Sequence, residues 1–388
     1  MKETLCFRFY VVFIVIFSTF VTGCDNRYSD NIVDLDSVTE LELNEINSDV
    51  KIMPIKCEDP MERIRKAVGF SDYTFLCSAT KTIIYCLQND SVISKLEAVG
   101  RGHGEYSCID DFTYLENEKV LYINADQKIM KYSVPSMIYL GSIDFNITTD
   151  EMVALNTDEL LAACSFFEDN DKKTIFRGVA VFSLKTGKII RKLYDYDQYN
   201  SNCFLYRDLS NNDNGILMSV GGLYNNQIFK WDNTEETTKE IFSFCYNSKW
   251  RVSKRIIRFS RKDFWLFDEE LMKRTVYCDG CHYPSIVNSN LVFWCFPHEN
   301  NTGRQIAVIK KGEDILTRSF YISGTNITVN PFFVKDGYCF DIVEGSAENI
   351  ITDKENLSPL GKEIYKTMQL QPYNNPILYC FSVDKNIK

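Results

Sequence analysis

The chain has 388 residues and a formal charge of −10, from 43 Lys and Arg against 53 Asp and Glu. Its 45% hydrophobic and 25% charged residues indicate a folded globular protein rather than a disordered one. The acidic balance excludes nucleic acid as an expected partner, because phosphate binding needs a basic face. Aromatic residues make up 14% of the chain, which favours β-sheet because aromatic side chains pack well on a pleated surface.

The first 23 residues predict a secretory signal. Lys2 and Arg8 supply a short basic region, and the following run Phe9–Val21 carries no charge. Its 13 residues suit the core of a signal peptide. A membrane-spanning helix takes about 20 residues, so an uncleaved anchor helix is the weaker alternative. No other stretch of the sequence is long and apolar enough to be a transmembrane helix.

The segment Val21-Thr22-Gly23-Cys24 resembles the bacterial lipobox. In proteins with that motif the Cys thiol is diacylated and the chain is cut before it, and more than one acyl chain gives stable membrane attachment. The resemblance implies lipidation of Cys24 and a membrane partner. We expect an exported lipoprotein that is anchored in the outer membrane, on the periplasmic side or at the cell surface. We expect a signal peptide over 1–23, a flexible tether over 24–40 and a single domain over 41–388.

Beyond residue 50 the chain repeats one pattern, a short apolar strand, a polar turn and a second apolar strand. The hairpins of this kind cover residues 82–100, 128–145, 178–197, 227–245, 262–280 and 305–323. Successive turns are 36 to 50 residues apart, with further strand-like runs between them. A period of this length carrying four short strands is typical of a propeller blade. The sequence therefore predicts an all-β propeller of four-stranded blades.

Residues Gly100-Arg-Gly-His-Gly-Glu-Tyr106 are followed by Ile109–Phe112 and by a hairpin that contains Asp126–Tyr132. Together with Asn375-Pro376-Ile377-Leu378 near the C-terminus, they resemble the six-bladed β-propeller lipoproteins of Gram-negative anaerobes, described as TolB-like or NHL-like. His103 stands where that family usually has Pro. The resemblance implies six blades and a surface or periplasmic address, and it implies no chemistry.

The Gly100–Tyr106 segment is interpreted as a turn between blades. The residues that we assign to this turn are Gly100, Gly102, His103, Gly104, Glu105 and Tyr106. Glycine permits positive φ angles where the chain leaves one blade for the next, and we expect Tyr106 to pack between the two blades. The alternative is a loop that binds a small molecule at the mouth of the propeller.

Two acidic clusters are candidates for cation binding through oxygen ligands. They are Asp110-Asp111 and Glu168-Asp169-Asn170-Asp171. The second cluster lacks the spacing and the glycine of a Ca²⁺ loop, so a solvated hairpin tip is the favoured interpretation. No metal site is assigned.

The sharpest local motif is Cys278-Asp-Gly-Cys281-His282, because C-x-x-C-H is the attachment motif of c-type haem. Three interpretations are open: haem attachment, a disulfide or reactive dithiol of Cys278 and Cys281, or an ordinary turn. We predict that the motif binds no haem, because the pattern continues a strand into a turn that contains Pro284. Other cysteines stand among strand aromatics and are expected in the core, namely Cys77, Cys86, Cys295, Cys339 and Cys380.

A propeller ring must join its first and last blades, or its sheet edges stay exposed. The strands Asp49–Lys56 and Pro376–Val383 are expected to share one closing blade. Six hairpins and this composite blade give seven blades, whereas the family resemblance gives six. Two helices are expected outside the strand pattern, over Pro60–Val68 and around Leu357–Thr367.

The sequence contains no nucleophile elbow, P-loop or H-E-x-x-H motif, so no catalytic residue and no cofactor is assigned. The leading hypothesis is a non-enzymatic binding or scaffolding module for an envelope protein or a glycan, which abundant Tyr and Trp would suit. The alternative is an envelope enzyme, a glycan-directed hydrolase or lyase with its site at the channel mouth. A redox or c-type haem protein, through Cys278, Cys281 and His282, is the third hypothesis.

Overall fold

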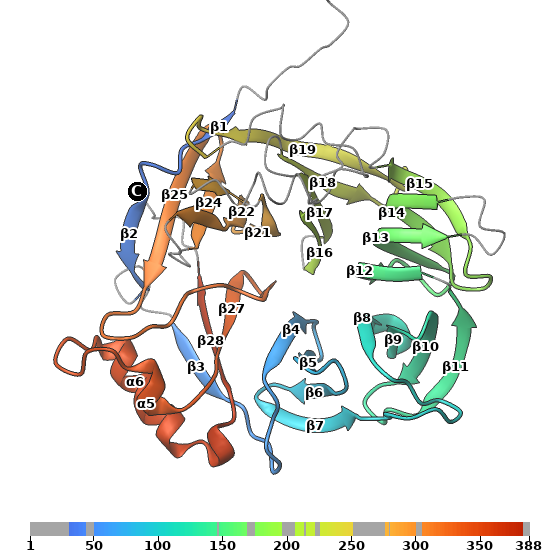
Figure 1. Cartoon of the computed structure of the whole chain (residues 1–388), viewed down its shortest axis with the longest axis horizontal. Helices are drawn as coiled ribbons and strands as arrows, with labels where there is room; N and C mark the ends of the chain where they lie inside the picture. The colour runs from blue at the N-terminus through green and yellow to red at the C-terminus, as the bar shows by residue number, and fades with distance from the viewer. Residues whose placement is uncertain are drawn as a thin grey trace, which may run out of the picture.

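Six β-sheets stand around a central axis as the blades of a propeller (Figure 1). The computed structural model describes residues 31–43, 50–145, 147–168, 175–195, 206–212, 215–221, 226–250, 276–278, 280–299 and 305–382. The predicted signal peptide and Cys24 lie outside these residues. The all-β propeller predicted from the repeats is confirmed, and its blades number six.

Blades 1 to 3 each hold four antiparallel strands, numbered from the axis outward (Figure 1). Blade 1 consists of β4 (Ile64–Gly69), β5 (Thr74–Ser78), β6 (Ile84–Gln88) and β7 (Ser91–Leu96). Blade 2 consists of β8 (Ile109–Leu115), the 3₁₀ turn η1 (Glu116–Glu118), β9 (Val120–Ala125), β10 (Lys128–Ser133) and β11 (Tyr139–Asp144). Blade 3 consists of β12 (Ile147–Ala154), β13 (Glu159–Glu168), β14 (Ile175–Ser183) and β15 (Ile189–Asp195).

Blades 4 and 5 repeat this plan and each add a fifth strand from the N-terminal segment. Blade 4 consists of β16 (Tyr206–Asn212), β17 (Gly215–Gly221), β18 (Asn226–Asp232), β19 (Thr237–Tyr246) and β1 (Ile32–Val33). Blade 5 consists of β21 (His282–Val287), β22 (Asn290–Cys295), β24 (Ile306–Lys311), β25 (Asp314–Tyr321) and β2 (Thr39–Glu42). A separate two-stranded sheet is formed by β20 (Val276–Cys278) and β23 (Pro297–Glu299).

Blade 6 is composed from both ends of the chain. Its strands are β26 (Phe333–Lys335), β27 (Tyr338–Val343), β28 (Ile377–Ser382) and β3 (Lys51–Pro54). Strand β3 pairs antiparallel with β28, with Ile377 opposite Pro54 and Cys380 opposite Lys51. The prediction that the N- and C-terminal strands share the closing blade is confirmed.

The alternative count of seven blades is wrong, because the described strands form six sheets of four or five strands around the axis. Five of the six hairpins supply the third and fourth strands of blades 1 to 5. The hairpin at 262–280 lies mostly outside the described residues. Its described end, β20, pairs with β23 instead of extending a blade.

The inner and middle strands are apolar because neighbouring blades cover both of their faces. Strands β5 and β22 are buried along their whole length, whereas the outer strand β11 alternates half-buried and exposed positions. An unbroken apolar run is the pattern of a strand covered on both faces. This is why short apolar runs recur so regularly along the chain.

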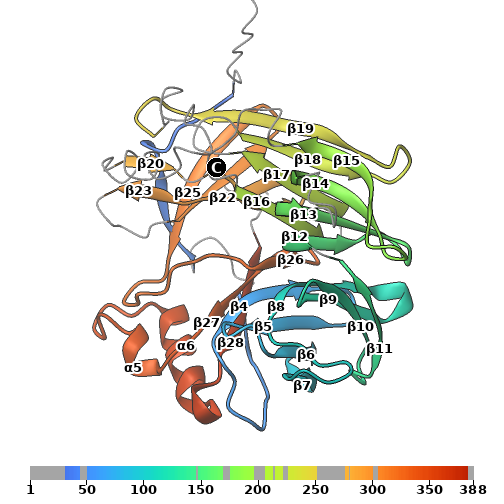
Figure 2. The same cartoon turned by 45° about the vertical axis from the view of Figure 1, so that its right-hand side comes forward.

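The helix expected around Leu357–Thr367 is present as α6 (Pro359–Leu370), beside blade 6 (Figure 2). The Ser358 side chain caps it by accepting a hydrogen bond from Gly361 N, and Pro359 occupies its first turn. The short helix α5 (Ala347–Ile350) precedes it, and the 3₁₀ turn η3 (Pro372–Asn374) follows it.

The helix expected over Pro60–Val68 is wrong, because Ile64–Gly69 forms the inner strand β4. The segment contains good helix formers, but β4 pairs along its length with β5. Tertiary pairing overrides intrinsic helix propensity here.

The segment expected as a tether over 24–40 is folded against the ring from Asn31 onward. Strand β1 pairs parallel with β19, and β2 pairs parallel with β25. We call residues 31–43 the strap, because they cover the outer edges of blades 4 and 5 before the chain reaches β3. Its Val33 and Leu43 side chains are buried, and this burial favours a docked segment over a free one.

The seam between blades 6 and 1 is held by one buried amide. Asn375, fully buried, accepts a hydrogen bond from Met61 N at 2.8 Å through its side-chain oxygen. Its Nδ2 donates to the backbone carbonyls of Asp59 at 3.1 Å and Cys57 at 3.5 Å. The side chain therefore fastens the start of the C-terminal strand to the segment that leads into blade 1.

Candidate functional site

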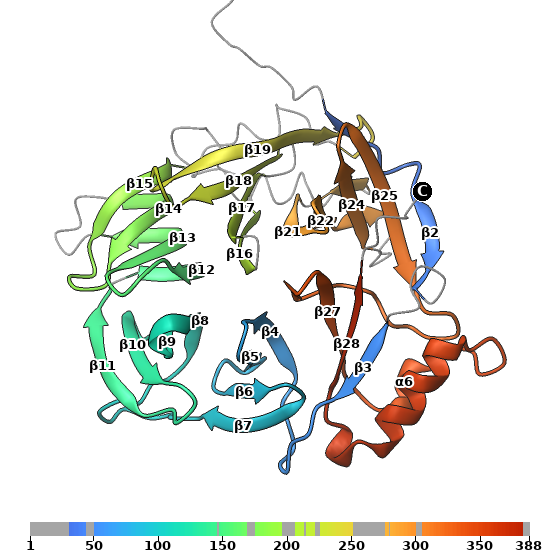
Figure 3. The same ribbon diagram turned by 180° about the vertical axis from the view of Figure 1, so that it is seen from behind.

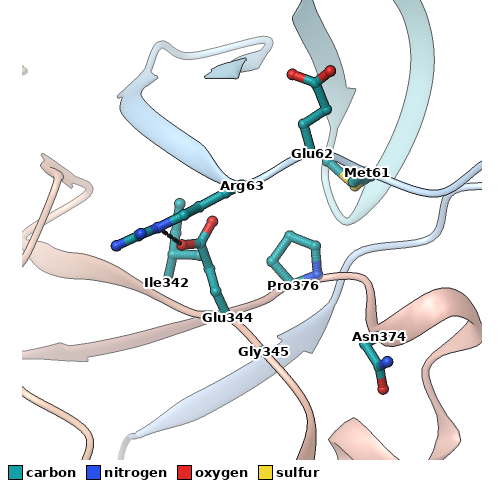
Figure 4. Close-up of a pocket in the computed structure, with 8 residues that line it drawn as sticks. All are labelled: Met61, Glu62, Arg63, Ile342, Glu344, Gly345, Asn374 and Pro376. Carbon is teal, nitrogen blue, oxygen red and sulfur yellow. Dashed lines mark hydrogen bonds and ion pairs between the residues drawn. The ribbon is translucent and has the colours of Figure 1, made fainter. Parts of the chain in front are cut away.

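A pocket of about 500 Å³ opens at the seam where blade 6 meets blade 1 (Figure 4). We call it the seam pocket. Three stretches of chain line it: the approach to β4, the end of β27 and the approach to β28. The lining residues are Met61, Glu62, Arg63, Ile342, Glu344, Gly345, Asn374 and Pro376.

An ion pair across the seam forms one wall of the pocket. Arg63 Nε lies 3.3 Å from Glu344 Oε2, and the Arg63 side chain is 83% exposed (Figure 4). Glu344 also accepts a hydrogen bond from Ile64 N. Burial raises the pKa of Glu344 and outweighs the opposing effects of Ile64 N and Arg63. The guanidinium thus stays largely open to solvent at the pocket, while its partner carboxylate is held in place.

An exposed aromatic residue adjoins the pocket lining in the sequence. Tyr373 is 64% exposed and directly precedes the lining residue Asn374. Both residues have left-handed backbones, with φ of 57° and 55°. This conformation is uncommon for Tyr, and such strain clusters at functional sites. The arrangement offers hydrogen-bonding groups inside the pocket and an aromatic face beside it.

A second charged cluster joins the inner strands of blades 1, 2 and 3. Lys66 Nζ on β4 lies 2.6 Å from Asp111 Oδ1 on β8 and 2.5 Å from Glu151 Oε2 on β12. Asp111 Oδ2 also accepts a hydrogen bond from Met152 N at 2.7 Å. Burial lowers the pKa of Lys66, but the attraction and hydrogen bonds of the two carboxylates outweigh it and raise that pKa overall. The ion pairs of this cluster therefore link three blades.

The Gly100–Tyr106 segment connects β7 of blade 1 to β8 of blade 2. Tyr106 is buried, and its hydroxyl donates to Thr82 O at 2.9 Å. Of the three glycines, only Gly104 has a positive φ, of 77°. A Cβ on Gly100 would lie 2.0 Å from Glu105 Oε2, so this glycine makes room for a carboxylate.

Two further residues of that segment complete its contacts. The Glu105 carboxylate accepts a hydrogen bond from Gly102 N at 2.7 Å. His103 is exposed, and its ring packs edge-on against Tyr139 with ring centres 4.9 Å apart.

Cys278 and Cys281 are both buried, in a core cluster that also holds Cys295 and Tyr246. The Tyr246 hydroxyl donates to Gly280 O at 2.5 Å and lies 3.3 Å from Cys295 Sγ. Burial raises the pKa of Cys295 and of Tyr246 well above their ordinary values. All eleven cysteines in the described part carry free thiols, so the dithiol stays a prediction.

The expected turn after Cys281 is instead the strand β21, which begins at His282 and contains Pro284. The pairing of β21 with β22 shifts register between His282 and Ser285, and Pro is accepted at such irregular positions. Cys77, Cys86, Cys339 and Cys380 are buried in strands, as the sequence predicts.

The acidic clusters fall in different places. Asp110 and Asp111 belong to β8, and burial raises the pKa of Asp110. Glu168 ends β13, and the rest of its cluster lies outside the described residues. Within the described ranges, no group of three or more His, Cys, Asp or Glu side chains is arranged to hold a metal ion. Among the same residues, no helix is long and apolar enough to cross a membrane.

The propeller fold corresponds to a known family. Residues 23–333 match the DUF5128 family of six-bladed β-propellers, so the chain belongs to that family. No curated protein matches the sequence.

Two solved structures from Bacteroides resemble the propeller. A candidate exported protein from Bacteroides fragilis is 11% identical, with a TM-score of 0.63 over 91% of this chain and 100% of that one. A member of the DUF4221 family from Bacteroides vulgatus is 7% identical, with a TM-score of 0.49 over 85% of this chain and 97% of that one. At such identities the first likeness shows the fold alone.

Sequence reasoning missed the seam pocket and the Lys66 cluster. The pocket joins residues about 280 positions apart, and only the Asn375-Pro376 motif pointed to its neighbourhood. A signal for the cluster was available, because Lys66 and Asp111 are charged residues within inner strands that also carry apolar residues. Charges at such positions require partners.

Asp341 lies behind the pocket wall, next to the lining residue Ile342. Its carboxylate accepts hydrogen bonds from Tyr379 Oη at 2.6 Å, Asn330 N at 2.8 Å and Ile342 N at 2.7 Å. Burial outweighs these hydrogen bonds and raises the pKa of Asp341 from 3.8 to about 7.

This raised pKa predicts that the protein loses stability as pH rises. At pH values between the pKa of Asp341 in the unfolded state and its pKa in the folded state, the folded protein keeps a proton that the unfolded protein releases. The free energy of unfolding should fall by roughly 3 kcal/mol from about pH 5 to about pH 8 through this group. Urea unfolding of Asp341→Asn should lack this part of the pH dependence, whereas Asp314→Asn, an exposed control, should keep it. Equal pH slopes for wild type and Asp341→Asn would contradict the assignment.

Proposed function

We propose that the protein is an exported lipoprotein whose propeller holds a glycan, without catalysis, in the seam pocket. The observation that carries this proposal is the pocket itself. Its volume of about 500 Å³ falls within the range of small-molecule sites, about 300–1,000 Å³. Its walls offer a guanidinium, carboxylates and an amide, which are suitable partners for sugar hydroxyls.

An exposed aromatic residue next to the pocket lining in the chain favours a glycan over a protein partner. Tyr373 presents an exposed ring beside the lining residue Asn374. An aromatic side chain with an apolar body and a polar tip suits a ligand that has both kinds of surface. Leu370 at the end of α6 adds an exposed aliphatic group nearby in the chain.

The charged cluster of the inner strands gives the enzyme alternative less support. A glycan-directed hydrolase at the channel mouth needs a carboxyl group that can donate a proton. Asp111 and Glu151 instead share the ammonium group of Lys66, which stays protonated. The haem alternative also has less support, because Cys278 and Cys281 are buried in a blade core.

Binding should depend on Arg63. We expect the purified chain to bind members of a panel of neutral and acidic oligosaccharides, measured by isothermal titration calorimetry. Arg63→Ala should weaken that binding by about 10- to 100-fold, because it removes charge-assisted hydrogen bonds. Arg101→Ala, which changes an exposed arginine of the Gly100–Tyr106 segment, should leave it unchanged.

Three outcomes contradict this proposal. Equal binding by Arg63→Ala would move the site away from the seam pocket. Release of reducing ends during the titration would favour the enzyme alternative. Binding of a purified envelope protein, with no binding to any oligosaccharide, would favour a scaffolding role.

The proposed address rests on the Phe9–Val21 signal core and on Cys24. Metabolic labelling with a radioactive fatty acid should tag the wild-type chain and leave Cys24→Ala unlabelled. Cys57→Ala is a matched control, because it removes a thiol of the folded domain and should not change labelling. Equal labelling of wild type and Cys24→Ala would refute lipidation at this position.

A further inference from the structure

The strap fixes the point where the N-terminal segment leaves the propeller. Asn31 O accepts a hydrogen bond from Cys245 N at 3.0 Å, and Val33 O accepts one from Asn247 N at 3.2 Å. The Asn31 side chain donates to Ser243 O at 2.8 Å. These contacts hold β1 on the outer edge of blade 4. The chain therefore departs from the rim of the ring, not from its channel.

A polar clamp follows directly after β1. Asp36 accepts a hydrogen bond from Trp250 Nε1 at 2.9 Å and pairs with Lys249 Nζ at 3.3 Å. Asn247 Nδ2 donates to Asp34 Oδ1 at 3.0 Å. Together with the pairing of β2 on β25, the clamp secures the strap at several points. A pull on the N-terminal end of the strap therefore acts on several contacts and not on one hydrogen bond at a time.

The chain between Cys24 and Asn31, where the strap begins, is short. Six residues separate Cys24 from Asn31, and the seven Cα-to-Cα steps between them span at most about 25 Å when fully extended. A domain of this size is about 50 Å across. A lipid on Cys24 can therefore keep the blade 4 rim near a membrane, whereas the opposite rim is out of its reach when the ring stands upright.

Blade 1 occupies the opposite side of the ring from blade 4. Strands β19 and β7, the outer strands of the two blades, lie across the axis from each other in views from both faces (Figures 1 and 3). The seam pocket lies between blades 6 and 1. The pocket is consequently on the side of the ring that is far from Asn31 and β1.

The outer edges of blade 4 and of the neighbouring blade 3 also carry apolar side chains that suit a lipid interface. Ile32 on β1 is 56% exposed and Ile241 on β19 is 40% exposed. Ile190, on the outer strand β15 of the neighbouring blade, is 51% exposed. Apolar groups of this kind add to the membrane binding that acyl chains supply.

We propose that the propeller stands on the membrane by the rim of blade 4, with the lipid surface against β1 and β19 and the seam pocket facing away. This orientation rests on the lipidation of Cys24 in the proposed function. It leaves both faces of the ring accessible, and it presents the pocket to ligands that approach from outside the membrane.

Energy transfer to the membrane tests this orientation. The acylated mature protein, which begins at Cys24, is bound to vesicles of phosphatidylethanolamine and phosphatidylglycerol that contain an acceptor lipid. A donor dye is attached through azidophenylalanine at position 241 or at position 93. These are matched sites, because Ile241 and Ile93 are isoleucines on outer strands with exposures of 40% and 42%. We expect transfer from position 241 to exceed that from position 93 by about twofold or more, given the about 50 Å that separates the rims.

The outcomes distinguish a failure of the proposed orientation from a failure of the lipid anchor. Equal transfer from the two positions would mean that the ring lies on one face. Greater transfer from position 93 would mean that blade 1, and not blade 4, is next to the membrane. Either result overturns the proposed orientation. Vesicle flotation is measured in parallel for wild type and Cys24→Ala. If the wild type does not float, or if Cys24→Ala floats equally well, the lipid anchor itself is refuted.

Discussion

Pairing between β3 and β28 is the interaction on which the rest of the structure depends. A propeller removes the exposed edges of its sheets only when the ring closes, and here closure joins residues from the two ends of the chain. Asn375 secures the junction because its buried amide has partners on the segment that leads into blade 1. The charged tie of Lys66, Asp111 and Glu151 then links blades 1, 2 and 3 on the inner side of the ring.

The same closure creates the candidate site. The seam pocket exists because blade 6 and blade 1 meet there, and its ion pair joins Arg63 on one blade to Glu344 on the other. Any ligand in the pocket would contact both ends of the folded chain. The strap covers the outer edges of blades 4 and 5, and its first strand, β1, lies on blade 4 across the ring from blade 1 (Figure 1). The proposed binding and anchoring regions are thereby separated on one ring.

Much of the fold could be predicted from local patterns, because a strand covered on both faces leaves an unbroken apolar run such as Asn290–Cys295. The strap could not, since the strands of residues 31–43 form only against edges more than 200 residues away in the sequence. Strand β4 was missed because its helix-forming residues gave no sign of pairing with β5. The seam pocket required distances between residues far apart in sequence, which only the closed ring supplies.

The most direct test of ring closure is the unfolding of Asn375→Ala, followed by tryptophan fluorescence. Of the tryptophans in the described chain, Trp231 lies in blade 4, Trp294 lies in blade 5 and Trp250 follows β19, so none is in the two blades that meet at the seam. If closure holds the ring together, loss of this buried amide should destabilise the fold by about 1–3 kcal/mol and shift the fluorescence transition to lower urea. Asn349→Ala, at an exposed position of α5, should leave it in place. A fluorescence transition that is unchanged in Asn375→Ala would contradict the dependence of the distant blades on the seam.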